Sequence, residues 1–314
     1  MPYRVGFLLV LLSCACAPPS RAQSLVTTIP VSGFPYGVAV NPGNNRIYVS
    51  LSTAVDVIDG ATNTVIDTVQ TPQGSTVIAA NMVTGRVYTA GCATTCGVTV
   101  IDGTTDTVIA TIPVKGSSGI GVEGIAVNPV TNRVYVSDNL IYEVEEIDGN
   151  SNTVLTYIKT DRTEMLALAV DFSTDQILGA ASGEAMIVIN GANNAVSRIK
   201  VGTINWGMAA NSFTSRAYVT NNVGNTLGVV NLVNSKVVAN VPVGSAPFEV
   251  CVDYLSNKIF VTNTGDGTVA VVDGKTNTKI GSVSANSNYI DVNPVTRMVY
   301  TSSTYGNMIN VISE

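Results

Sequence analysis

The chain has 314 residues, of which 46% are hydrophobic and only 12% are charged, and its formal net charge is −6. It contains no histidine, which excludes His-ligated zinc, copper and haem and every Ser-His or Cys-His nucleophile. An acidic surface with few Lys and Arg residues also argues against binding to nucleic acid or to an anionic membrane.

The first 22 residues are predicted to be a secretory signal peptide. Arg4 supplies the positive start, residues 5–12 the apolar segment and residues 20–22 a cleavage site of A-x-A type. The apolar segment is too short to span a bilayer, and no later stretch reaches about 18 uninterrupted apolar residues. We therefore expect an exported protein, periplasmic or extracellular, with no transmembrane segment. A lipid anchor at Cys14 or Cys16 is the less favoured alternative, because the flanking residues match a lipidation motif poorly.

From residue 24 onward, a unit of about 40 residues occurs seven times. Each unit carries a large apolar anchor residue, preceded two positions earlier by Arg or Lys in five copies and by Gln or Met in the others. The anchors lie 40 to 47 residues apart, at Tyr48, Tyr88, Tyr135, Leu178, Tyr218, Phe260 and Tyr300. A fixed period of this length in a strand-rich sequence is typical of a β-propeller.

The first unit shows how one blade is predicted to fold. Four short apolar runs, at residues 37–40, 46–50, 55–58 and 64–69, are separated by turn residues such as Asn-Pro-Gly-Asn and Asp-Gly. These turns have a mechanism, since Gly accepts positive φ and Asn or Asp bonds to its own backbone. Four antiparallel strands form one propeller blade.

The two ends of the repeat array are predicted to share one blade. The chain stops after the third strand of the seventh unit, and residues 24–33 match the fourth strand at residues 107–116. Pairing of the first strand with the last would close the ring and leave no open sheet edge. We therefore expect residues 24–314 to form a single all-β domain, a seven-bladed propeller of four-stranded antiparallel blades.

The repeats also resemble a known family. Tyr218-Val-Thr-Asn221, Phe260-Val-Thr-Asn263 and Tyr135-Val-Ser-Asp138, together with the recurrent Val-Ile-Asp-Gly segment, are similar to YVTN-family β-propeller repeats. The resemblance covers essentially all of residues 24–314 and implies an exported seven-bladed propeller with WD40-like architecture. Members of the family are mostly of unassigned activity. The fourth unit departs from the pattern at Leu178-Gly-Ala-Ala181.

Three cysteines follow the predicted signal peptide. Cys92 and Cys96 bracket three residues of a loop, and export favours a disulfide between them. The closed loop is short, so the bond is expected to stiffen that loop more than to stabilise the fold. Cys251 replaces an alanine of a buried strand and is interpreted as core packing.

The loops of the repeats indicate where a ligand would bind. The Asn-Pro and Asp-Gly turns are nearly identical between units and are interpreted as structural, whereas the loops on the other face diverge. Residues that enter the first strand of each unit would surround one mouth of the channel. The predicted ligand-binding residues are Tyr36, Glu123, Trp206, Phe248 and Tyr289, with Arg162 in the fourth inter-blade loop. Aromatic rings there would stack on a sugar, a peptide or another planar ligand, and packing of the rim is the alternative.

Acidic residues also occur at the predicted channel. Glu123, Glu249 and Asp291 would suit Ca²⁺, which prefers oxygen ligands, and solvated acids lining a water-filled channel are the alternative. No other cofactor is indicated. Glu146 replaces a valine found in five other units. We expect an Arg or Lys partner beside it, and a buried carboxyl with a raised pKa is the alternative.

The predicted function is that of a non-catalytic binding or scaffold propeller, since no catalytic motif is present and no catalytic residue is assigned. Its ligand would be a protein, a glycan or a cell-envelope component, bound to the variable loop face of a monomer. The alternative is a hydrolase, lactonase or lyase that uses a divalent cation at the channel mouth. Loss of residues 1–22 removes two arginines and no acid, so the net charge changes from −6 to −8, and nucleic acid is not an expected partner.

Overall fold

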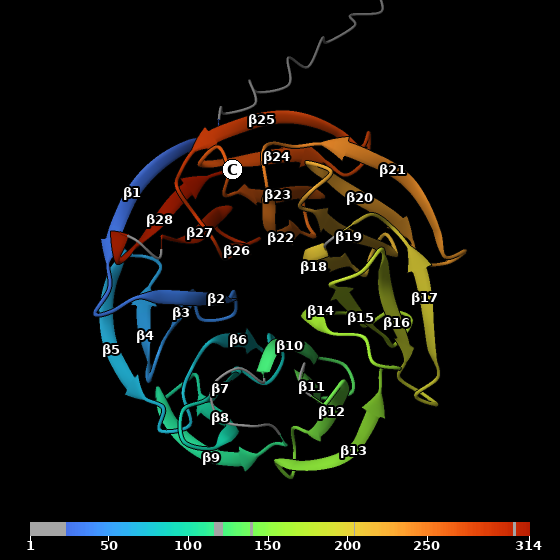
Figure 1. The fold of residues 1–314 in the computed structure, drawn as a ribbon. Coiled ribbons are helices and arrows are strands. Elements are labelled where there is room, and N and C mark those ends of the chain that lie inside the picture. Colours follow the sequence, from blue (N-terminus) through green and yellow to red (C-terminus); the bar gives the residue numbers. More distant parts are fainter. Residues whose placement is uncertain (1–22, 116–121, 139–140, 204, 304–305) are drawn as a thin grey trace, which may run out of the picture.

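The computed structural model describes residues 23–115, 122–138, 141–203, 205–303 and 306–314. These residues form 28 strands in seven four-stranded antiparallel sheets. The sheets stand around a central channel as the blades of a propeller (Figure 1). The predicted fold class, an all-β seven-bladed propeller, is confirmed. The predicted signal peptide lies outside the described residues and stays a prediction.

Each blade runs from an innermost strand at the channel to an outermost strand at the rim. The innermost strands are β2 (Pro35–Asn41), β6 (Val77–Ala80), β10 (Val122–Asn128), β14 (Met165–Asp171), β18 (Asn205–Asn211), β22 (Pro247–Asp253) and β26 (Ile290–Asn293). The second strands are β3 (Arg46–Leu51), β7 (Arg86–Cys92), β11 (Arg133–Asp138), β15 (Gln176–Ala181), β19 (Arg216–Asn221), β23 (Lys258–Asn263) and β27 (Met298–Ser303). The third strands are β4 (Ala54–Asp59), β8 (Cys96–Asp102), β12 (Glu143–Asp148), β16 (Ala185–Asn190), β20 (Thr226–Asn231), β24 (Thr268–Asp273) and β28 (Met308–Ser313). The outermost strands are β5 (Thr64–Gln70), β9 (Thr107–Pro113), β13 (Thr153–Lys159), β17 (Val196–Lys200), β21 (Lys236–Pro242), β25 (Thr278–Ser284) and β1 (Ser24–Pro30).

The ring is closed by strands from opposite ends of the sequence. β1 pairs antiparallel with β28, from Ser24 opposite Ser313 to Pro30 opposite Met308, and the seventh sheet has the order β1-β28-β27-β26. Figure 1 shows β1 lying outside β28 in that blade. The pairing satisfies backbone groups that an open edge of β28 would expose, and it confirms the predicted closure.

The turn between the first and second strands contains a left-handed residue in every blade. It lies three positions before the anchor, with φ between 49° and 73°, and is Asn45, Gly85, Asn132, Asp175, Ser215, Asn257 or Arg297. Asn and Gly tolerate this conformation better than other residues, which explains their frequency at this position of the repeat.

The same position links neighbouring blades. The side-chain amide of the Asn at the end of a first strand, or directly after it in the second blade, donates to the left-handed residue of the next blade at 2.7 to 2.9 Å. Among the described residues, four such bonds occur: Asn81 to Asn132, Asn128 to Asp175, Asn211 to Asn257 and Asn293 to Asn45. The last of them joins the seventh blade to the first. The recurrent Asn of the repeat therefore bonds one blade to the next, beyond capping its own turn.

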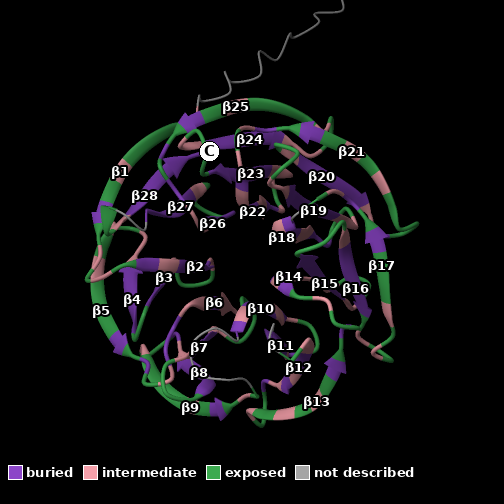
Figure 2. Cartoon of the chain, in the orientation of Figure 1, coloured by how far each residue is buried: buried purple, intermediate pink, exposed green. Residues whose placement is uncertain are grey.

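The core lies between the blades. All seven anchors are at most 1% exposed, and each packs among side chains of an adjacent blade. Tyr48, for example, packs against Ile78 and Val87, and its hydroxyl donates to the carbonyl of Gly103 at 3.2 Å. Figure 2 shows the result, with buried residues in the inner three strands and exposed residues along the outermost strands.

Candidate ligand-binding site at the channel mouth

One mouth of the channel opens into a cavity of about 650 Å³. Its walls come mainly from the innermost strands of all seven blades, from entry residues such as Tyr36 and Phe248 to residues near the strand ends such as Ala80 and Val252. Small residues such as Ala39, Ala79 and Ala209 line its deeper part and leave the channel open. Five of the six residues predicted to bind a ligand lie in this wall: Tyr36, Glu123, Trp206, Phe248 and Tyr289.

Three aromatic rings follow one another around the rim. The ring centroids of Trp206 and Phe248 are 5.5 Å apart and the planes are stacked at 29°. The rings of Phe248 and Tyr289 meet edge to face at 85°, with centroids 5.4 Å apart. All three side chains are partly exposed to the cavity. We call these three residues the aromatic arc. It spans three consecutive blades because each repeat delivers its entry residue to the same place.

Two carboxylates bind backbone amides at the channel wall. Asp291 Oδ2 accepts from the backbone N–H of Val40 in the first blade at 2.7 Å, and its Oδ1 accepts from Val292 at 2.8 Å. Glu249 Oε1 accepts from the backbone N–H of Val250 at 3.2 Å. An innermost strand has one edge without a partner strand, so its N–H groups need acceptors. Asp291 of the seventh blade supplies such an acceptor to Val40 of the first blade.

Burial sets the electrostatics of the cavity. Burial, and to a smaller extent the nearby Asp291 carboxylate, raises the pKa of Glu249 to about 8. Hydrogen bonds from the backbone amides of Val250 and Met208 oppose this rise. Burial also raises the pKa of Asp291 to about 6. The pKa of Tyr289 is raised to about 12, first by burial and then by the nearby Glu249 and Glu123. At neutral pH Asp291 is therefore ionised while Glu249 is mostly protonated, so Asp291 gives the cavity negative charge.

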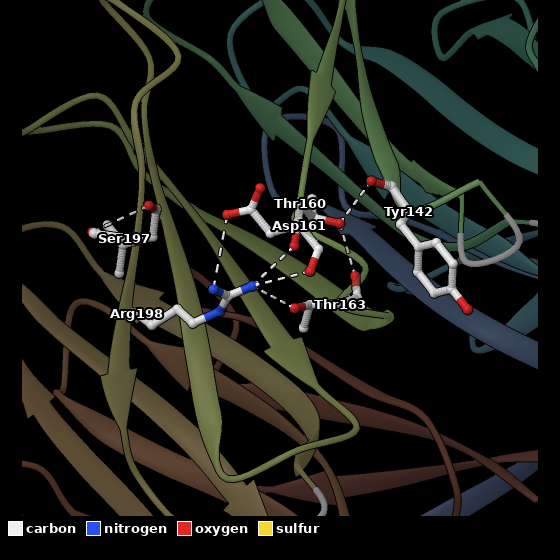
Figure 3. Close-up of polar contacts among 7 residues, drawn as sticks. Tyr142, Thr160, Asp161, Thr163, Ser197 and Arg198 are labelled. Carbon is white, nitrogen blue, oxygen red and sulfur yellow. Dashed lines mark hydrogen bonds and ion pairs between the residues drawn. The ribbon is translucent and has the colours of Figure 1, made fainter.

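Arg162, the sixth predicted ligand-binding residue, lies apart from the cavity. It is exposed in the linker between β13 and β14, with φ of 61°, and is not among the residues that line the channel mouth. Arg198 of β17 holds this linker, donating to the carbonyl of Thr160 at 3.2 Å and to Thr163 Oγ1 at 2.7 Å (Figure 3). Its guanidinium also lies 3.8 Å from Asp161.

The three residues proposed as metal ligands do not form a ligand set. In the ranges that the structure describes, no group of three or more His, Cys, Asp or Glu side chains is placed to hold a metal ion. Both carboxylate oxygens of Asp291 already accept backbone amides. Glu123, Glu249 and Asp291 nevertheless all line the cavity.

A disulfide joins Cys92 and Cys96 across the loop between the second and third strands of the second blade. Cys92 also lines the cavity, which the sequence pattern did not indicate. The adjacent Gln73 accepts from Thr95 Oγ1 at 2.7 Å and from the backbone N–H of Ala93 at 3.0 Å. The bond thus holds a loop at the rim of the site.

Glu146 has the basic partner that the sequence led us to expect. Its carboxylate lies 3.4 Å from Arg133 Nε, and Arg133 also pairs with Asp148 at 3.2 Å. Burial raises the pKa of Glu146, and the Arg133 charge opposes that rise. The pair crosses adjacent strands and is far along the chain from the aromatic arc.

The chain matches no protein-family model and no curated protein. Its fold is similar to that of solved structures. A chain of Kuenenia stuttgartiensis hydrazine synthase superposes with a TM-score of 0.77 at 13% identity, covering 90% of this chain and 96% of that one. A chain in a crystal structure of the mitotic checkpoint complex gives 0.80 at 12% identity, covering 100% and 99%. At these identities the likeness establishes the β-propeller fold alone.

The described residues include no helix long and apolar enough to cross a membrane.

Proposed function

We propose that this chain is an exported, non-catalytic binding or scaffold propeller of the YVTN type, which recognises a protein, a glycan or a cell-envelope component through its variable loop face. The observation that supports this most is the aromatic arc of Trp206, Phe248 and Tyr289 at the rim of a 650 Å³ cavity. Partly exposed rings in a concave, rigid wall bury ligand surface without ordering a loop.

The remaining features of the cavity favour binding over catalysis. Its carboxylates bind backbone amides, as Asp291 does with Val40, and this arrangement orients them as part of the wall. The chain has no histidine to serve as general base or metal ligand. The Tyr-Val-Thr-Asn repeats and the N-terminal segment of residues 1–22 support the YVTN type and export.

The binding site is tested by calorimetric titration of the exported protein with oligosaccharides, peptidoglycan fragments and envelope proteins. Once a ligand is found, Trp206→Ala should weaken its binding by at least about tenfold, as expected for a central aromatic contact. Phe213→Ala is the matched control, because Phe213 also contacts two aromatic rings but follows the opposite end of β18. Unchanged binding by Trp206→Ala would disprove the site.

Export is tested separately by expressing the full chain and sequencing the N-terminus of the secreted product. We expect it to begin at Gln23, after removal of residues 1–22. Retention of the full chain inside the cell would contradict the proposed location and leave the binding site untouched.

A further inference from the structure

We propose that the channel mouth binds a quaternary or other alkyl-ammonium group, held against the aromatic arc. This inference rests on the proposed function, because it assigns a ligand class to the same site. It follows from the orientation of the rings, the charges in the cavity wall and the partial enclosure of the cavity.

The rings provide two walls at nearly right angles. Phe248 and Tyr289 are inclined at 85°, and Trp206 stacks on Phe248 at 29°. The face of an aromatic ring is electron-rich and attracts a cation within about 6 Å of its centroid, and Trp is the strongest of the three types. Adjacent perpendicular walls let one cation approach more than one ring, as in aromatic cages for quaternary ammonium groups.

The charges of the wall select the sign of the ligand. Among the described residues that line the cavity there is no Lys or Arg, while Glu123, Glu249 and Asp291 are all present. An anionic ligand would meet these carboxyl groups with no basic side chain to receive it. A cation would instead be attracted by the ionised Asp291, and its approach would favour the ionised form of Glu249, which is mostly protonated at neutral pH.

The chemistry of the walls selects an alkylated cation. A bare ammonium group needs hydrogen-bond acceptors for its three N–H groups, whereas a trimethylammonium group has no donors and buries its methyl groups on the rings. The chain already contains one cation–π contact, with Lys115 Nζ 3.4 Å from the centroid of the Tyr157 ring at an outer strand. That cation is exposed, whereas one at the channel mouth would be partly desolvated, which strengthens the attraction.

Trp206 is the one tryptophan of the sequence, so intrinsic fluorescence reports directly on the site. The exported protein is titrated with tetramethylammonium and choline, and with 3,3-dimethylbutanol, the neutral carbon isostere of choline. We expect a saturable change with both cations and binding of the isostere weaker by about tenfold. Phe248→Leu, and Glu249→Gln measured at pH 9 where Glu249 is mostly ionised, should each weaken choline binding by about three- to tenfold. Phe213→Leu is the matched control and should leave it unchanged.

Two probes then separate the sources of the group, phosphatidylcholine vesicles for a lipid headgroup and a trimethyl-lysine peptide for a modified protein. Saturable binding of either supports the inference and names the source. Equal binding of choline and its isostere, or choline binding unaffected by Phe248→Leu and Glu249→Gln, would overturn it. A response to a neutral oligosaccharide with none to the cations would overturn the inference while supporting the proposed function. A response to no ligand class would count against both.

Discussion

Two buried carboxylates occupy the same position of the third strand in different blades and differ in their partners. Asp56 accepts from the backbone N–H and hydroxyl of Ser32 and from Thr68 Oγ1, at 2.7 to 3.0 Å. Glu145 accepts from the backbone N–H of Lys115 at 2.6 Å, and its Oε2 has no hydrogen-bond partner among the described residues. Burial raises the pKa of Glu145 to about 7, and the nearby Asp138 and Glu143 contribute to the rise.

Glu145 is therefore expected to make stability depend on pH. Between its unfolded pKa of 4.5 and its folded pKa of about 7, the folded state holds a proton that the unfolded state has released. Unfolding free energy should fall as pH rises through this window, by on the order of 3 kcal/mol at most. Urea unfolding at pH 5 and pH 8 measures the difference, which Glu145→Gln should reduce.

Glu184→Gln is the control for that measurement, because the Glu184 side chain is 58% exposed beside Lys200. It should leave the pH dependence as in the parent protein. An equally steep fall in Glu145→Gln would mean that other carboxyl groups carry the effect, such as the buried Asp253, whose pKa is raised to about 6.

At the scale of one blade, the fourth unit shows how a large side chain on one strand makes up for a missing side chain on its neighbour. The fourth unit has Gly179 where other units have Val or Thr, yet its sheet of β14 to β17 is complete. Met165 occupies the missing volume: a Cβ on Gly179 would lie 2.2 Å from its sulfur. Met is flexible enough to fill such a gap. In this blade a large side chain at the start of the first strand, Met165, fills the volume that a second-strand side chain fills in the other blades.

The Asn bonds between blades should contribute measurably to stability. Asn211 and Asn231 both accept a backbone N–H two residues on, from Phe213 at 3.1 Å and Val233 at 2.9 Å. Asn211 in addition donates to Asn257 of the next blade and is fully buried. Asn211→Ala is expected to cost about 1–3 kcal/mol, because it leaves a buried partner unsatisfied. Chemical denaturation measures the loss.

Asn231→Ala removes the turn bond alone and serves as the control, with an expected cost below about 1 kcal/mol. Equal losses for the two variants would show that the bond to the next blade adds nothing to the turn.

At the scale of the molecule, the ring depends on one strand that is remote in sequence from the rest of its blade. β1 and β9 share the ending Thr-Ile-Pro, and their isoleucines, Ile29 and Ile112, are 2% and 3% exposed. Ile112 belongs to a blade built from continuous chain, whereas Ile29 belongs to the blade that closes the ring.

We expect Ile29→Ala and Ile112→Ala to destabilise the protein similarly, by about 2–5 kcal/mol each, since both create a cavity in a core between blades. Thermal or urea unfolding provides the comparison. A much smaller loss for Ile29→Ala would show that β1 is docked more weakly than the other outermost strands. Ile66→Ala on β5, where the side chain is 45% exposed, should cost less than either.

Removal of divalent cations should leave the melting temperature unchanged. The described acids of the channel do not form a three-residue ligand group. Melting with and without EDTA, together with metal analysis of the purified protein, tests this expectation. Stoichiometric Ca²⁺ and a large downward shift with EDTA would contradict it and bring back the cation-dependent hydrolase, lactonase or lyase.

The sequence alone determined the number of blades, the strand order and the closure of the ring. Those features depend on local signals, namely alternating apolar runs and turns with positive φ, and they recur seven times. The sequence also indicated the rim position of Tyr36, Glu123, Trp206, Phe248 and Tyr289, since each repeat places its entry residue at the same height of the channel.

The tertiary structure alone decided which of these residues contact one another and which groups they bond to. Trp206, Phe248 and Tyr289 are about 40 residues apart in sequence, and their ring angles depend on how three blades pack together. Arg162 lies in a linker that Arg198 holds through hydrogen bonds. The position of Arg162 within its repeat therefore did not predict where it lies. Asp291 of the seventh blade accepts from the backbone N–H of Val40 in the first blade, and the sequence near either residue does not predict that bond. Contacts between blades depend on the geometry of the whole ring, which no single repeat contains.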